Sequence, residues 1–252
     1  MEHRDGIIKS IIIVAGVVLG AYLLGNSIER FKKEDRYISV KGFSEKEVKA
    51  DLVIWSMKIR TASDDLVKGN AALESSKNKV VSFLTSKGIN ANEINVQNLI
   101  VKDREATEYA PINAGNQKRY IIEEIIEVRS NNVDGVQKIS RMTNELLGTG
   151  VALSNKNDWT GSGLEYIFTG LNSIKPVMIT EAIKNAKSAA GQFTKESETK
   201  LGKMRKASQG LFSIQDRDSY LSGNGDGGGA GQLNADPYKK IRVVISVDYS
   251  IE

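Results

Sequence analysis

The stretch KKIRVVISVDYSI, residues 239–251, has the most regular alternation of apolar and polar side chains in the chain. Every second residue from Ile241 to Ile251 is apolar, and most of the residues between them are polar. Successive side chains of a β-strand point to opposite faces, so this pattern predicts a strand with one face buried against a core.

A second long strand is predicted over residues 47–61. Its apolar face consists of Val53, Trp55, Met57 and Ile59. Ala50, Leu52 and Ile54 lie on the opposite face, so the first half of the strand is expected to be covered on both sides. Residues 37–43, 94–108, 119–130, 150–153, 164–171 and 203–214 have shorter patterns of the same kind and are also predicted to be strands.

Helices are predicted over residues 64–87, 133–147 and 174–199. The first begins at Ser63-Asp64-Asp65, which can cap a helix, and ends at Gly88. Pro176 is expected in the first turn of the third helix, where proline is tolerated. The inward-facing residues expected on the helices are Leu66, Leu73, Val80 and Leu84 on the first, Val136, Ile139, Thr143, Leu146 and Leu147 on the second, and Ile179, Ala182, Ile183, Ala186, Ala190 and Phe193 on the third.

These patterns predict an α+β domain over residues 37–252, in which three helices pack on a mixed or mostly antiparallel sheet. One N-terminal transmembrane helix is expected to precede it, since residues 7–24, IIKSIIIVAGVVLGAYLL, contain a single charge, Lys9. Residues 1–6 then form a short tail, residues 7–25 a signal-anchor helix, and residues 26–36 a charged linker. Leu23 is bulky where a cleaved signal peptide needs a small residue, which favours an uncleaved anchor.

The flanking charges leave the orientation of this anchor open. Arg4 and Lys9 precede or begin it, whereas Arg30, Lys32, Lys33 and Arg36 follow it. A count of basic residues would place the C-terminal side in the cytoplasm, but long domains are translocated largely regardless of charge.

The composition excludes several kinds of site. The chain has no cysteine, so it has no disulfide, thiolate metal site or cysteine nucleophile. Its one histidine, His3, precedes the anchor, so residues 37–252 lack the commonest general base and metal ligand. With 35 basic and 31 acidic residues the charge is of mixed sign, which argues against nucleic-acid binding.

Two Ser-x-x-Lys pairs could in principle supply a serine nucleophile and a lysine base, as a chain without a suitable histidine would need. They are Ser76 with Lys79 and Ser197 with Lys200. Both pairs fall in predicted helices rich in lysine and serine, where such a spacing arises by chance. An exposed helix surface is therefore the favoured interpretation, and no catalytic residue is predicted.

Candidate ligand sites are also better explained as ordinary structure. Glu123, Glu124 and Glu127, or Asp216 with Asp218, could bind a hard cation, but solvated strand edges explain them better. The glycine-rich run from Gly223 to Gly231 lacks the lysine of a phosphate-binding loop and is expected to be a hairpin tip. Core or interface positions are expected for the aromatic residues Trp55, Trp159 and Tyr166. No metal or cofactor site is predicted.

Several segments together resemble the bacterial SIMPL-domain proteins. They are RYISVKG from Arg36, EVKAD from Glu47, the pair Lys175-Pro176, KMRKASQG from Lys203 and KIRVV from Lys240. The resemblance covers nearly all of residues 36–252. It implies an α+β fold, export to the periplasm or outer surface, a homo-oligomeric, channel-like ring in some members, and a link to oxidative-stress tolerance. The family has no established catalytic residues.

Sequence and resemblance together predict a non-enzymatic, single-pass protein of the inner (cytoplasmic) membrane. Its C-terminal domain is expected in the periplasm, where it acts through homo-oligomerisation as a scaffold or ring in the cell envelope. The expected partners are the membrane and further copies of the chain, and not nucleic acid. One alternative is a binding or adaptor module for another envelope protein. Another is a lysine- or metal-assisted hydrolase.

Overall fold

A computed structural model describes residues 36–106, 117–155, 163–218 and 236–252, together with Gly16 and Gly20. The described residues divide into two compact units. Unit 1 contains residues 36–45, 175–213 and 242–252, and unit 2 contains the described residues within 46–174 and 214–241. Strands β1 (Tyr37–Lys49) and β10 (Tyr238–Ile251) contribute residues to both units.

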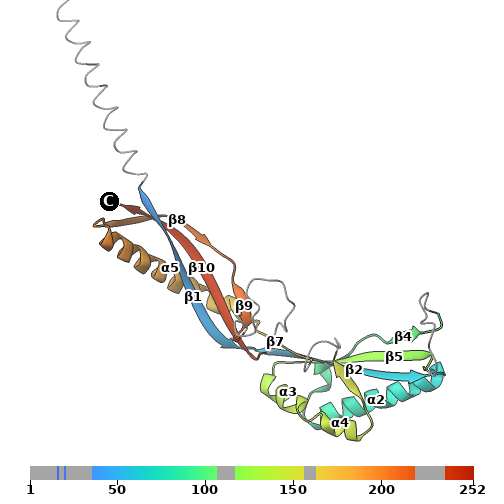
Figure 1. Ribbon diagram of the computed structural model, residues 1–252. Coiled ribbons are helices and arrows are strands. Elements are labelled where there is room, and N and C mark those ends of the chain that lie inside the picture. Colours follow the sequence, from blue (N-terminus) through green and yellow to red (C-terminus); the bar gives the residue numbers. More distant parts are fainter. Residues whose placement is uncertain (1–15, 17–19, 21–35, 107–116, 156–162, 219–235) are drawn as a thin grey trace, which may run out of the picture. The chain divides into compact units, whose positions relative to one another are not determined.

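Unit 1 is built on a sheet with the strand order β1-β10-β8, where β8 is Leu201–Gln209 (Figure 1). Strand β9 (Ser213–Asp216) also pairs with β10. The alternation that predicted β10 is confirmed, since Val243, Ile245, Val247 and Tyr249 are at most 3% exposed. Helix α5 (Leu171–Glu196) packs on the sheet of this unit through a stripe of mostly small residues.

Unit 2 contains a six-stranded sheet whose described pairings are antiparallel. Its central strands are β5 (Tyr120–Ser130) and β2 (Leu52–Ser63). Strands β3 (Ile94–Val96) and β4 (Ile100–Asp103) pair with β5, whereas β6 (Leu153–Asn155) and β7 (Leu164–Ile167) pair with β2. The predicted strand over residues 94–108 is therefore interrupted between β3 and β4.

The helices of unit 2 cover the apolar face of β2. They are α2 (Leu66–Ser86), α3 (Val133–Ser140) and α4 (Asn144–Gly148), with the short 3-10 helix η1 at Ala91–Glu93. Their buried residues form one core with Val53, Trp55, Met57 and Ile59, all at most 2% exposed. Oδ1 of Asp65 caps α2 by accepting from the backbone N–H of Val67 at 2.9 Å. Gly88 follows α2 with a φ of +95°, as the predicted helix end requires.

The predicted α+β class and its three helical regions are confirmed, but several details were wrong. The described strands form two sheets instead of one. The second helical region is divided into α3 and α4, and Leu147, expected to face inward, is 58% exposed. Leu66, also expected on an inward stripe, is 43% exposed because it lies in the first turn of α2.

The boundary of the second strand was also wrong. β1 continues to Lys49, and the chain turns at Asp51 before β2 begins. The turn is fixed by hydrogen bonds of Asp51, whose Oδ1 accepts from the backbone N–H of Thr169 at 2.8 Å. Its carbonyl accepts from Nδ2 of Asn131 at 2.8 Å. A run of apolar residues does not reveal such a turn, because both flanking strands continue the same pattern.

Helix α5 differs from the prediction in its start and in its buried face. It begins at Leu171, so Pro176 lies beyond the first turn. The buried stripe repeats every four residues: Met178, Ala182, Ala186, Ala190 and Thr194. Phe193, expected in this stripe, is 60% exposed.

Several predicted features lie outside the described residues. These are the signal anchor over residues 7–25 apart from Gly16 and Gly20, the linker before Arg36, Trp159 and the glycine-rich run from Gly223. Within the part of the chain that the structure describes, no helix is long and apolar enough to cross a membrane.

Candidate functional site

Three of the four side chains in the two Ser-x-x-Lys pairs donate hydrogen bonds to backbone carbonyls. Oγ of Ser76 donates to the carbonyl of Ala72 at 3.0 Å, and Nζ of Lys79 donates to the carbonyl of Thr149 at 2.9 Å. Oγ of Ser197 donates to the carbonyl of Phe193 at 2.9 Å. Both serine hydroxyls therefore donate to the backbone of their own helical segment.

The three glutamates of β5 do not converge on one point. Glu123 is 5% exposed and lies 2.6 Å from Nε of Arg60 and 3.3 Å from Nζ of Lys102. Glu124 is on the opposite face, because neighbouring strand residues alternate. It lies 3.8 Å from Nζ of Lys77. Burial raises the pKa of Glu124, with Glu74 raising it further and Lys77 opposing the shift. Within the described residues no group of three or more His, Cys, Asp or Glu side chains is placed to hold a metal ion.

Asp216 and Asp218, the second candidate pair of carboxylates, contact different basic residues. Asp216 forms an ion pair with Lys239, which is 1% exposed. Asp218 lies 3.5 Å from the guanidinium of its neighbour Arg217. Asp216 therefore neutralises a buried ammonium, and the two aspartates do not form a shared cation site.

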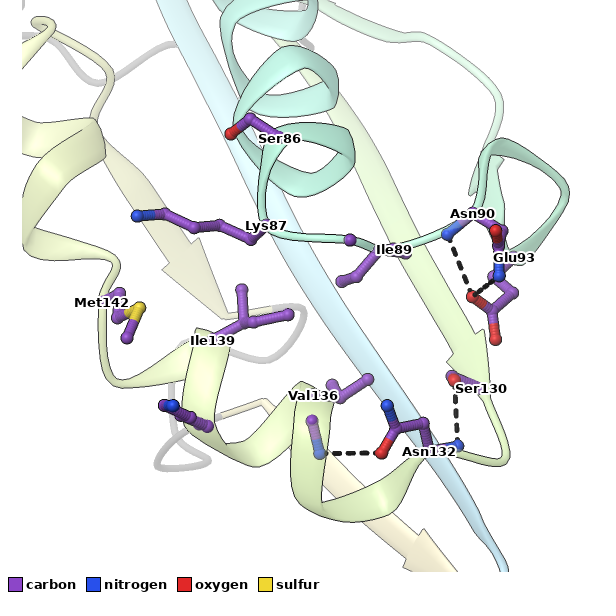
Figure 2. Close-up of a pocket in the computed structure, with 13 residues that line it drawn as sticks. Ser86, Lys87, Ile89, Asn90, Glu93, Ser130, Asn132, Val136, Ile139 and Met142 are labelled. Atoms are coloured by element: carbon purple, nitrogen blue, oxygen red, sulfur yellow. Dashed lines mark hydrogen bonds between the residues drawn. The ribbon is translucent and has the colours of Figure 1, made fainter.

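A groove of about 450 Å³ lies in unit 2, between the end of α2 and the start of α3 (Figure 2). The apolar part of its lining comes from Ile89, Val136, Ile139 and Met142. Ile89, Val136 and Ile139 are at most 9% exposed, so this part is a continuation of the core. Figure 2 shows these side chains between Lys87 on one side and Asn90 and Glu93 on the other.

The polar end of the groove is held by hydrogen bonds within the protein. Oε2 of Glu93 accepts from the backbone N–H of Asn90 at 3.1 Å and from its side chain at 3.2 Å. Hydrogen bonds from Ser130 and Asn90 lower the pKa of Glu93, so this end carries a negative charge at neutral pH. Oδ1 of Asn132 accepts from the backbone N–H of Gly135 at 3.0 Å and caps α3.

Lys87 lies on the other side of the groove (Figure 2). Its Nζ lies 2.8 Å from Glu145. The arrangement offers an apolar floor between opposite charges, which suits the binding of a chain segment or small molecule. Sequence reasoning missed this groove because its lining combines residues 86–93 with residues 130–142. The helix end at Gly88 and the strand end at Asn131 were its only local signals.

Comparison with known protein families gives a match over residues 38–249. The matching family model is SIMPL, described as "Protein of unknown function (DUF541)". The chain belongs to the SIMPL family. The resemblance predicted from the sequence is thereby confirmed, and the match includes residues of both units. A search of curated proteins finds no match.

Unit 1 of this SIMPL protein exposes several large apolar side chains. On α5, Val177 is 62% and Phe193 is 60% exposed. On β8, Met204 is 45% exposed, and Leu211, just after β8, is 95% exposed. Single exposed apolar residues are common on protein surfaces, whereas a contiguous apolar patch is typical of a surface that binds another protein.

Proposed function

We propose that this SIMPL protein is a non-catalytic scaffold that assembles with copies of itself at the cell envelope. Residues 7–25 hold it in the inner membrane as a single-pass anchor. Residues 37–252 lie on the periplasmic side and form a ring-like or other closed homo-oligomer with a role in envelope or oxidative stress.

The observation that carries this proposal is the set of exposed apolar side chains in unit 1. Val177, Phe193, Met204 and Leu211 are each at least 45% exposed. Transferring apolar surface out of water contributes roughly 25 cal/mol per Å², so burying these side chains between copies would favour association. The buried side chains of β10 show that unit 1 has a core of its own.

Support for the membrane anchor comes from residues 7–24, which contain one charge in eighteen positions. Such a length fits the roughly 17 to 25 residues that a membrane-spanning helix needs. Attachment to one membrane would also raise the effective concentration of copies and promote their assembly.

The location is tested by protease protection of the full chain in intact spheroplasts. The proposal expects protease added outside to digest residues 37–252 while a short N-terminal fragment remains in the membrane fraction. Full protection of the C-terminal domain until the membrane is broken would contradict it. The assembly is tested by the mass of the full chain after extraction in mild detergent.

A second candidate function is that of an adaptor for another envelope protein, and the groove of unit 2 favours it. A photo-crosslinking amino acid in place of Ser86, which is exposed and lines the groove, would capture a bound segment in living cells. Adducts of one defined heterologous mass would support an adaptor. Adducts at multiples of the chain's own mass would instead place the groove at the contact between copies.

A further inference from the structure

Helix α5 lies over β1 and reaches its outer edge. The side-chain position of Gly42 meets the backbone of α5 at Ala182 and Ala186. Nδ2 of Asn185 donates to the carbonyl of Phe43 at 2.9 Å. The carbonyl of Arg36 accepts from the backbone N–H of Ile251 on β10. Successive residues of a strand point their backbone groups to opposite edges. Seven residues further on, the carbonyl of Phe43 therefore points away from β10, and Asn185 crosses the free edge to reach it.

The opposite edge of the same sheet, β8, has no such cover. Ala207 and Gln209 pair with Val247 and Ile245 of β10, so they share the face on which α5 lies. Both β10 residues are at most 2% exposed, whereas every residue from Lys203 to Gln209 is exposed. Among the described residues, α5 thus covers β1 and β10 but leaves β8 bare (Figure 1).

We propose that the overhanging flank of α5 in one copy covers the bare β8 of the next copy, head to tail. This inference rests on the proposed self-assembly and specifies its contact. The contact brings β1 of one copy alongside β8 of its neighbour. Both strands run antiparallel to β10, so they run parallel to each other. The sheets of neighbouring copies therefore have their strands in the same orientation. A contact between two different surfaces is heterologous, and it generates a ring when the rotation closes.

The apolar side chains of the two surfaces lie at matching levels. Phe193 is seven residues beyond Ala186, about 10 Å along a helix, which equals about three residues of a strand. Ser39 lies three residues before Gly42 on β1. The hydrogen bond between Arg36 and Ile251 sets the pairing of β1 with β10, and in this pairing Ser39 lies opposite Asp248. Asp248 pairs with Lys206, and the next pair is Tyr249 with Met204. When neighbouring copies lie side by side at the same level, Phe193 of one copy meets Met204 of the next.

The charges of β8 and the overhang of α5 both disfavour a symmetric contact. Strand β8 carries Lys203, Arg205 and Lys206 and no acidic residue. Two β8 strands placed edge to edge would bring these like charges together, which disfavours a symmetric contact through β8. Two β1 edges would also bring two overhanging helices together, which need 8–10 Å between their axes, about twice the strand spacing.

The absence of cysteine from the chain allows a clean disulfide test. Phe193→Cys is combined in turn with Leu201→Cys, Met204→Cys and Ala207→Cys in the full membrane-bound chain, so that a small shift along the strand is covered. A disulfide within one copy leaves the chain at its monomer mass on a non-reducing gel, so only a link between copies gives a ladder. The matched control is Val67→Cys with Leu147→Cys, two exposed positions of unit 2.

The inference expects a ladder of disulfide-linked multimers from at least one double variant after oxidation. Each single variant and the control pair should stay monomeric on a non-reducing gel. An oligomer of normal mass with no ladder would overturn this contact and leave the proposed self-assembly standing. Dimers from the Phe193→Cys or Met204→Cys single variant would show a symmetric contact and also overturn it. A chain that is monomeric throughout would overturn both proposals.

Discussion

The close contact between Gly42 and α5 makes Gly42→Ala the most informative stability variant of unit 1. A Cβ at this position would overlap the carbonyl oxygen of Ala182 and the backbone nitrogen of Ala186. It would also lie 2.8 Å from the Cβ of Ala186, where ordinary contacts are 3.4–4 Å. Two of these three atoms belong to the helix backbone, so no change of side-chain rotamer can make room.

The cost follows from what has to move. Overpacking a tight site typically costs 1–3 kcal/mol, and the rigid backbone on the helix side places this variant at the upper end, about 3 kcal/mol. Lifting α5 also loosens the contacts of Ala182, Ala186 and Ala190, which are fully buried in the parent chain. We therefore expect the loss of stability to be concentrated in α5 and β1.

Hydrogen exchange measured by mass spectrometry resolves this loss by segment in the full chain. Gly42→Ala should accelerate exchange of the α5 and β1 peptides by roughly 100-fold, the equivalent of about 3 kcal/mol, and leave α2 unchanged. The matched control is Gly191→Ala on α5, where nothing lies within 4 Å of the new Cβ. It should stabilise the helix by about 0.5–1 kcal/mol, since alanine is the better helix former. Unchanged exchange of α5 in Gly42→Ala would refute the close packing described here.

Three further predictions concern unit 2. Asp65→Ala removes the cap of α2 and should lower the free energy of unfolding by about 1 kcal/mol in a urea titration, whereas Asp65→Asn should lower it less. Asp216→Ala leaves the buried ammonium of Lys239 without this partner and should lower the free energy of unfolding by about 3–5 kcal/mol in the same assay. Changing both Asp216 and Lys239 to apolar residues should restore most of the lost free energy. Burial raises the pKa of Glu124, so the folded state holds its proton more tightly than the unfolded state. The free energy of unfolding then falls as pH rises from the ordinary value of 4.5 through the raised pKa, and Glu124→Gln should remove this fall, as thermal unfolding across pH would show.

The sequence predicted best those features that depend on local pattern. The alternation of Ile241, Val243, Ile245 and Val247 identified β10 and its buried face, and the stripe of β2 did the same for unit 2. Local chemistry also identified the start of α2 at Asp65 and its end at Gly88. Alternation does not specify which strands pair, however, and the division into two sheets was therefore missed.

The errors in α5 have a physical cause. Its buried residues repeat every four positions because small side chains let one line of the helix lie directly on β1 at Gly42. An apolar residue next to this line, such as Phe193, has no room beneath the helix and stays exposed. Nothing near Phe193 in the sequence shows this, because the reason is a glycine about 150 positions earlier. The groove of unit 2 was missed for the same kind of reason, since two distant segments form it.

The mass of the intact particle tests the central claim most directly. The full chain of 27.6 kDa, extracted from membranes in mild detergent, can be measured by native mass spectrometry, which removes the detergent before the mass is read. The account predicts one closed assembly at a fixed multiple of the chain mass, stable on dilution. A particle at the mass of a single chain, under conditions in which α5 remains protected from hydrogen exchange, would contradict it.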